Sequence, residues 1–166
     1  MKTETLKQTV RFQASAKEVF DLFMDAKKHR LFTGSPAVIS RKEGGKFSTY
    51  AGMCHGRNIE IVEGEKIVQA WRAEDWPSGV YSLLTLKLIP QGDHSSRLEV
   101  LQTAVPGQRN LEKIKQGWNE HYWGPMKAYF KQQNGQNEKH KITMLKDKET
   151  SRSGTMKIGR TLRRVA

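Results

Sequence analysis

The chain has 166 residues, a net charge of +12 and a hydrophobic fraction of 36%. This length suits one domain with an additional segment, and no apolar run approaches the ~18 residues that a transmembrane helix needs. The only cysteine is Cys54, which excludes an internal disulfide and is typical of a reducing compartment. Because the N-terminus lacks the apolar region of a signal peptide, we predict a cytoplasmic protein that does not enter a membrane.

Charge and hydrophobicity divide the chain into two parts. Residues 1–130 contain 19 Lys and Arg against 14 Asp and Glu, a net charge of +5, and they hold nearly all of the aromatic and aliphatic clusters. Residues 131–166 contain 10 basic against 3 acidic residues, a net charge of +7. We therefore predict a folded domain over residues 1–131 and a basic, flexible extension over residues 132–166.

The basic extension raises the question of a nucleic-acid or lipid partner, since clustered positive charge attracts both. It has no interleaved aromatic residues on which bases would stack. A solvated extension is therefore the favoured interpretation, and nucleic acid is not an expected partner. A nucleic-acid-associated protein recruited by this segment stays as a third functional alternative.

The first predicted elements are a strand and two short helices. Strict alternation over residues 6–14 predicts a half-buried strand. Ser15 and Glu18 have the spacing of a capping box, so a helix is expected to begin there. A second short helix is predicted over residues 26–32, and it is ended by Gly34 and Pro36.

From residue 38 to residue 103 the hydrophobic period changes to two, which predicts strands. Glycine-containing turns at Gly44, Gly64 and Gly92 separate them. With the first strand, we predict about six antiparallel strands in meander order.

A long helix is predicted over residues 108–130. Its apolar face contains Leu111, Ile114, Trp118, Tyr122, Pro125 and Tyr129. A neighbouring stripe of mostly small residues contains Gly117, His121, Gly124 and Ala128. Pro125 removes one backbone hydrogen bond and is expected to kink the helix near Tyr122. The element order predicts an α+β fold in which a bent sheet wraps around this helix.

An apolar pocket between the sheet and the helix is the candidate binding site. A curved sheet does not contact a kinked helix everywhere, and the stripe of small residues leaves space. The candidate ligand-binding residues are Trp71, Trp118, His121, Tyr122 and Met126, with Gln69 as a further polar group. The alternative, in which these aromatic residues simply form the core, stays open.

Patterns for metal binding and catalysis are weak. Cys54 and His55 are adjacent, so on a strand they point to opposite faces, and the other histidines lack metal-ligand spacing. Glu74 and Asp75 are expected to lie in a solvated loop. We therefore predict no metal, no cofactor and a non-enzymatic protein. A cyclase- or hydrolase-like enzyme is the alternative, with His121 and Tyr122 as its only internal polar candidates.

Three stretches carry a family resemblance. They are residues 31–47, with their Gly44-Gly45 turn, residues 71–79, which read W-R-A-E-D-W-P-S-G, and residues 116–123, which read Q-G-W-N-E-H-Y-W. In this order, over residues 4–130, they resemble the activator of Hsp90 ATPase homologue 1-like family. The resemblance implies a START-like helix-grip fold, which agrees with the predicted element order.

The resemblance also implies a function. It suggests a binding module whose partner is an Hsp90-family chaperone, acting as a weak co-chaperone. The wider superfamily contains lipid carriers and cyclases, so a small apolar ligand in the pocket is the competing expectation. In eukaryotic members a separate N-terminal domain supplies a second chaperone contact, and without that tethered contact binding is expected to be weak.

Overall fold

The computed structural model describes the backbone of residues 1–163 and the side chains of residues 1–154. Contacts divide the chain into two compact units, Met1–Phe130 and Lys131–Ala166. The first unit contains every strand among the described residues, together with the candidate site.

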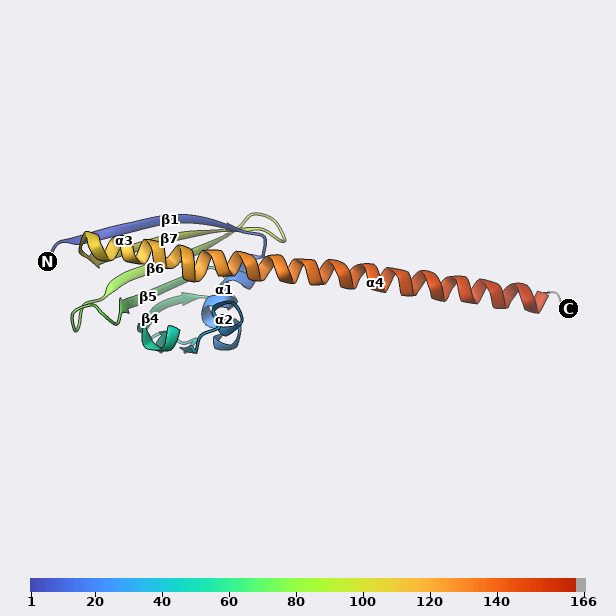
Figure 1. The fold of residues 1–166 in the computed structure, drawn as a ribbon, viewed down its shortest axis with the longest axis horizontal. Helices are drawn as coiled ribbons and strands as arrows, with labels where there is room; N and C mark the ends of the chain where they lie inside the picture. Colours follow the sequence, from blue (N-terminus) through green and yellow to red (C-terminus); the bar gives the residue numbers. More distant parts are fainter. Residues whose placement is uncertain (164–166) are drawn as a thin grey trace. The chain divides into compact units, whose positions relative to one another are not determined.

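The first unit is built on a seven-stranded antiparallel sheet (Figure 1). In spatial order its strands are β1 (Thr3–Phe12), β7 (Ser96–Pro106), β6 (Ser82–Pro90), β5 (Lys66–Ala73), β4 (Cys54–Val62), β3 (Lys46–Thr49) and β2 (Val38–Ile39). Strands β2 to β7 form the predicted meander, and β1 pairs with β7 at the opposite edge. The prediction of six strands is wrong by one. The region after residue 38 was predicted to form strands, and the structure has there the short edge strand β2 of only two residues, so a count from the sequence alone is imprecise at this edge.

Helices α1 (Ala16–Met24), α2 (Ala26–Thr33) and α3 (Gly107–Trp118) accompany the sheet. Helix α3 contacts β1 and β7, and α1 contacts β6. The core between these elements contains Phe12, Phe20, Leu84, Leu86 and Leu98, all at most 1% exposed. The fold is therefore a sheet that buries one face against helices, as predicted.

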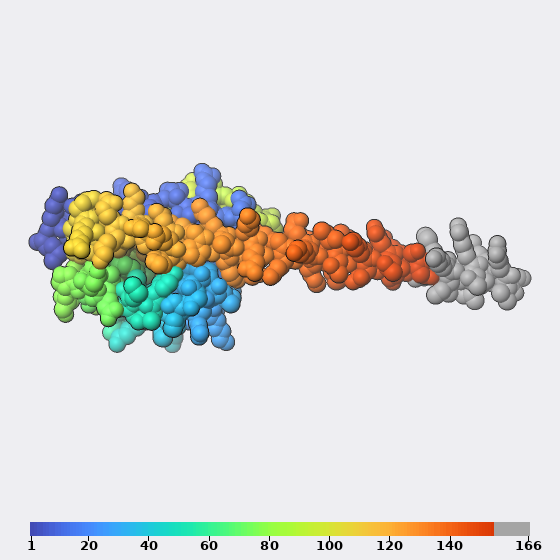
Figure 2. Space-filling model, viewed as in Figure 1, coloured from blue at the N-terminus to red at the C-terminus, as the bar shows by residue number. Residues whose placement is uncertain are grey.

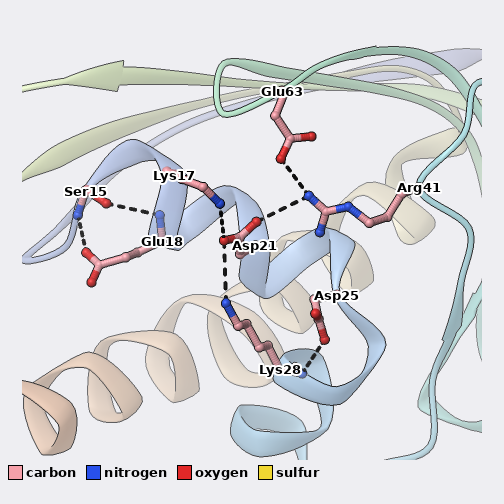
Figure 3. A network of polar contacts seen from close by, with 8 residues as sticks. All are labelled: Ser15, Lys17, Glu18, Asp21, Asp25, Lys28, Arg41 and Glu63. Carbon is pink, nitrogen blue, oxygen red and sulfur yellow. Dashed lines mark hydrogen bonds and ion pairs between the residues drawn. The ribbon is translucent and has the colours of Figure 1, made fainter.

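A polar network joins α1 and α2 to two loops (Figure 3). The carboxylate of Asp21 lies 2.7 Å from Lys17, 3.5 Å from Lys28 and 3.4 Å from Arg41, and Arg41 also pairs with Glu63 at 2.7 Å. Burial alone would raise the pKa of Asp21, but the hydrogen bond and charge of Lys17, together with Lys28 and Arg41, outweigh burial and lower that pKa. The network anchors both helices to the loop after β2 and to the β4–β5 turn.

The start of α1 follows the predicted capping box. The Ser15 hydroxyl accepts a hydrogen bond from the backbone N–H of Glu18 at 3.1 Å, and the Glu18 carboxylate accepts one from the N–H of Ser15 at 2.7 Å. Asp25 then caps α2 by accepting from the N–H of Lys28 at 3.0 Å. Gly34 ends α2 with a φ of 65°, which a residue with a Cβ rarely adopts.

The long C-terminal helix is interrupted where the kink was predicted. A π-helical turn, η2 (Asn119–Trp123), separates α3 from α4 (Gly124–Arg163). Pro125 has no N–H, so it does not donate to the carbonyl of His121 four residues earlier. The hydroxyl of Tyr50 donates to that carbonyl instead. The backbone group that proline leaves without a helical partner is thus satisfied from across the fold.

The long helix was predicted to end at residue 130, and this prediction is wrong. Helix α4 continues to Arg163. Nearly all side chains of residues 131–154 are exposed. That exposure explains why the sequence has no clear period there, since no face of the helix is buried. The separable, flexible character of residues 132–166 stays a prediction.

Truncation after Gln133 tests this prediction. Because residues 134–154 expose their side chains, we expect the thermal midpoint of the domain to stay within a few degrees of that of the full chain. Near-ultraviolet circular dichroism is the suitable measurement, since all four tryptophans precede the truncation point. A fall of ~10 °C or more would mean that the removed segment packs on the domain.

Candidate functional site

A groove of about 670 Å³ opens beside α3. Its walls are α3 with η2, the loop between β5 and β6, and the short 3-10 turn η1 (Tyr50–Gly52). In Figure 2, α3 (yellow), the β5–β6 loop (green) and the η1 region (teal) meet on one face of the domain. We call this feature the α3 groove.

Aromatic side chains form the floor of the α3 groove. The ring centroids of Trp71 and Trp118 lie 5.9 Å apart, those of Trp71 and Trp76 5.5 Å, and those of Trp118 and Tyr122 4.7 Å. Each of the four residues is at most 7% exposed. Rings at such distances and tilted angles attract one another beyond simple area burial, so the floor is a rigid apolar surface.

A chain of buried hydrogen bonds holds the floor in place. The indole N–H of Trp118 donates to the side-chain oxygen of Gln102 at 2.9 Å, and the Gln102 amide donates to the hydroxyl of Ser82 at 2.8 Å. Ser82 in turn donates to the backbone carbonyl of Trp71 at 2.9 Å. Gln102 is fully buried. This chain links α3 through β7 and β6 to β5, so it fixes the position of both tryptophans.

The β5–β6 loop is shaped by the residues that resemble the family motif. The guanidinium of Arg72 donates to the carbonyls of Trp76 and Pro77 and lies 5.8 Å from the centroid of the Tyr81 ring. Gly79 has a φ of 75°. Arg72 therefore folds the loop back on itself, which places Trp76 inside the groove.

The opposite wall, η1, has strained backbone. Tyr50 and Ala51 have φ values of 51° and 54°, in the left-handed region that disfavours residues with a Cβ. Two contacts hold the turn: the Tyr50 hydroxyl bonds the His121 carbonyl, and the Glu74 N–H donates to the Met53 carbonyl at 2.9 Å. The strained turn is thus held on both sides of the groove, as is typical of backbone strain at functional sites.

Behind the floor lies a buried polar cluster. The hydroxyl of Tyr122 donates to the hydroxyl of Thr49 at 3.3 Å, and His29 Nε2 lies 3.1 Å from the same Tyr122 oxygen. His29 Nδ1 is buried and has no hydrogen-bond partner among the residues that the structure describes. Burial lowers the pKa of His29 to about 4. The imidazole is therefore neutral at physiological pH.

Burial also affects Tyr122 and Cys54 at the floor. Burial raises the pKa of Tyr122 far above its ordinary value, and burial also raises the pKa of the Cys54 thiol to about 12. A thiol with such a pKa is not an activated nucleophile. The buried part of the floor therefore offers mainly apolar contact.

Charged residues occupy the rim. Glu74 and Asp75 project from the β5–β6 loop, and Glu120 lies on η2. Lys113 on α3 forms an ion pair with Asp75 across the groove at 2.6 Å. Both partners of this pair are more than half exposed, so its contribution to stability is small.

Four of the five sequence-predicted site residues line the groove: Trp71, Trp118, His121 and Tyr122. Met126 does not line it; this side chain is fully buried in the core. Gln69 also lies elsewhere, where its amide donates to Asn58 at 2.9 Å. Gly117 of the predicted small-residue stripe does line the groove, and a Cβ added there would meet no atom within 4 Å.

Sequence reasoning missed several lining residues, among them Tyr50, Met53 and Trp76. Trp76 had a signal, because it belongs to the motif-like stretch 71–79. Tyr50 and Met53 lie in a short irregular turn between strands, where no periodic pattern marks a functional side chain.

The predicted separation of Cys54 and His55 is seen in the structure. Cys54 lines the α3 groove, whereas His55 lines a different surface hollow with Phe47 and Tyr81. The described residues contain no group of three or more His, Cys, Asp or Glu side chains able to hold a metal ion. Within residues 1–163, no helix has an apolar stretch long enough to span a bilayer.

A curved antiparallel sheet around a long C-terminal helix, with two short helices after the first strand, defines a helix-grip domain with a surface groove. Residues 13–131 match the family model described as Activator of Hsp90 ATPase homolog 1-like protein, and the chain belongs to this family.

Relatives agree with this assignment. The chain is 37% identical over 128 residues to the activator of 90 kDa heat shock protein ATPase homolog of Dictyostelium discoideum, covering 77% of this chain and 33% of the relative. It is 30% identical over 126 residues to the human homolog 1, covering 76% and 36%. The chain thus spans about a third of the length of these relatives.

Solved structures show the same fold. The crystal structure of an HSP90 activator from Plasmodium falciparum superimposes with a TM-score of 0.72 at 26% identity, covering 75% of this chain and 94% of that one. A Chromobacterium violaceum protein superimposes with a TM-score of 0.61 at 21% identity, covering 76% and 96%.

Replacement of Met126 by Trp tests whether this position is core. Because Met126 is fully buried, the larger ring should overpack its site and lower the free energy of unfolding by roughly 1–3 kcal/mol. Met126→Leu, which nearly conserves the volume, should cost less than about 1.5 kcal/mol. Denaturant unfolding measures both. A Trp variant as stable as the parent would place unfilled space at Met126.

The neutral, buried His29 predicts a pH dependence. Its folded pKa of about 4 lies below the unfolded value of 6.5. The unfolded state therefore binds the proton more tightly, and stability is lost as pH falls below 6.5 toward 4. The expected loss from this one group is about 3 kcal/mol.

Variants isolate this effect. In His29→Phe, the free energy of unfolding should fall less steeply between pH 6.5 and pH 4 than in the parent, because no imidazole takes up a proton on unfolding. His94→Gln, at an exposed position, should leave the parent slope unchanged. Denaturant titrations at several pH values provide the measurement. Equal slopes in His29→Phe and the parent would refute the assignment.

Proposed function

We propose that this chain is a partner-binding module of the Hsp90-activator kind and that it contacts an Hsp90-family chaperone through the α3 groove. The observation that carries this proposal is an open groove with an aromatic floor in a domain of this family. Hot-spot contacts between proteins use pockets of this kind, which bury an anchor side chain of the partner.

Packing in the rest of the domain supports a surface contact over an enclosed ligand chamber. The side chains between the sheet and the C-terminal helix are close to fully buried, among them Leu84, Leu98 and Met126. The ring of Phe12 packs against those of Trp123 and Phe130, at centroid distances of 6.5 and 5.9 Å. A carrier of the enclosed type would need this interior to be empty.

The expected affinity is low. The relatives named as ATPase activators are about three times as long as the matched segment. Two tethered contacts gain roughly 10²–10⁴ in affinity over one alone through effective concentration. A contact made by this domain alone does not include that gain, so we expect the isolated domain to bind weakly and to stimulate the chaperone ATPase modestly.

A small apolar ligand is the second candidate occupant. The volume of about 670 Å³ falls in the range of small-molecule sites. Native mass spectrometry of the chain purified from its own host separates the two candidates, since a retained ligand adds a discrete mass whereas a chaperone co-purifies.

Gly117→Leu is the sharpest test of the groove. A side chain at position 117 meets open space inside the groove, so leucine should fill it without a clash. Because glycine is a poor helix former, the free energy of unfolding should hold or rise, by up to ~1 kcal/mol. Binding to a purified Hsp90-family chaperone, measured by biolayer interferometry, should weaken at least ~10-fold.

Gly135→Leu is the matched control. Gly135 also lies in a helix with no atom within 4 Å of an added Cβ, and it does not line the groove. This variant should bind the chaperone as the parent does. If Gly117→Leu bound equally well, the groove would not be the contact; if the parent did not bind at all, the chaperone would not be the partner.

A further inference from the structure

The charges around the α3 groove carry an inference about what enters it. Resting on the proposed binding role of this groove, we infer that its occupant is a partner segment with an apolar anchor side chain flanked by Lys or Arg. The argument combines the sign of the rim charges with the chemistry of the floor.

The rim is acidic on a domain that is otherwise basic. Its charged lining residues are Glu74, Asp75, Lys113 and Glu120, a net charge of −2, whereas residues 1–130 together carry +5. Local charges dominate recognition, because charges beyond ~8–10 Å are screened at physiological salt. The groove therefore attracts positive flanks, although the domain as a whole would attract a negative partner.

The nearby cations do not neutralise this rim. Lys113 is paired with Asp75, and the guanidinium of Arg72 is bound to two loop carbonyls. Among the described residues, no cation forms an ion pair with Glu74 or Glu120; Glu120 accepts a hydrogen bond from the neutral amide of Gln116 at 2.8 Å. These two carboxylates, one on each wall, are the groups available to a cationic partner.

The floor suits an apolar anchor with such flanks. Three indole rings converge there, and Met53, which is 63% exposed, extends the apolar surface to the rim. Methionine adapts its shape to different partners, and indole faces accept both aliphatic side chains and the stems of Lys or Arg. A segment with acidic flanks would instead face Glu74 and Glu120, where like charges repel.

Three peptides that differ only in their flanks test the inference. Each is acetylated, amidated and centred on Leu-Phe, with two Lys, two Ser or two Glu residues on either side. Titration at low salt, followed by calorimetry and by the emission of the groove tryptophans, should show the Lys peptide binding about tenfold more tightly than the Glu peptide. Raising the salt to about 0.5 M should remove most of that difference.

Charge variants show whether the rim is responsible. In the double variant Glu74→Gln, Glu120→Gln, the preference for the Lys peptide should fall to about twofold or less. Glu112→Gln is the matched control, since Glu112 is an exposed residue of α3 that bonds Gln108 and does not line the groove. This control should keep the parent preference.

The other outcomes overturn either the inference or the proposed function. Equal binding of the Lys and Glu peptides would leave the apolar anchor without charge selection, and preferential binding of the Glu peptide would reverse the assignment. If no peptide bound while the parent still bound the chaperone in a Gly117-dependent manner, the inference would fail and the proposed function would stand. Selective binding of the Lys peptide without chaperone binding would sink the proposed function alone.

Discussion

The hydrogen-bond chain from Trp118 through Gln102 and Ser82 to the Trp71 carbonyl sets how closely the C-terminal helix approaches the sheet. Each polar atom in it is buried, and leaving one unpaired would cost about 1–3 kcal/mol. The helix is therefore held at the position in which all three of these hydrogen bonds form. Two of the indole rings in the groove floor, those of Trp118 and Trp71, are positioned by this constraint, because Trp118 donates the first hydrogen bond and the Trp71 carbonyl accepts the last one.

The interruption of the helix follows from a second backbone requirement. Pro125 leaves the His121 carbonyl without its helical donor, and Tyr50 supplies one from the far wall of the groove. To reach it, Tyr50 and Ala51 adopt left-handed backbone conformations that cost about 1 kcal/mol or more each. The η1 turn, the π-helical turn η2 and Pro125 therefore depend on one another structurally. A change at any of the three is expected to alter the inner end of the groove.

Periodicity predicted the regular parts of the structure, and it failed where the π-helical turn interrupts the C-terminal helix. Trp118 and Tyr122 were found because they repeat at helical spacing before the interruption. The π-helical turn contains an extra residue, which rotates every later position by roughly one residue, or about 100°. A helical wheel drawn through Asn119–Trp123 therefore assigns Pro125 and Tyr129 to the apolar face, whereas the structure buries Met126 and Phe130 there instead.

Other features had no local signal at all. Nothing near Tyr50 in the sequence indicates that its hydroxyl completes a helix some seventy residues later. The continuation of α4 beyond Phe130 was equally invisible, because a helix that is exposed on all sides has no apolar stripe. Both features depend on contacts, or on the absence of contacts, that a single sequence does not encode in its periodicity.

The floor of the α3 groove belongs to the core of the domain, whereas its charged rim does not, and Gly117 lies between the two. The core side chains are in close contact with one another, so most changes there are expected to alter the free energy of unfolding. Position 117 faces open space. The charged residues on the same wall, Lys113 and Glu120, are exposed and do not belong to the core. Substitutions at the rim and at position 117 are therefore expected to change the proposed binding site with little effect on the fold, because function depends on sites rather than on the scaffold.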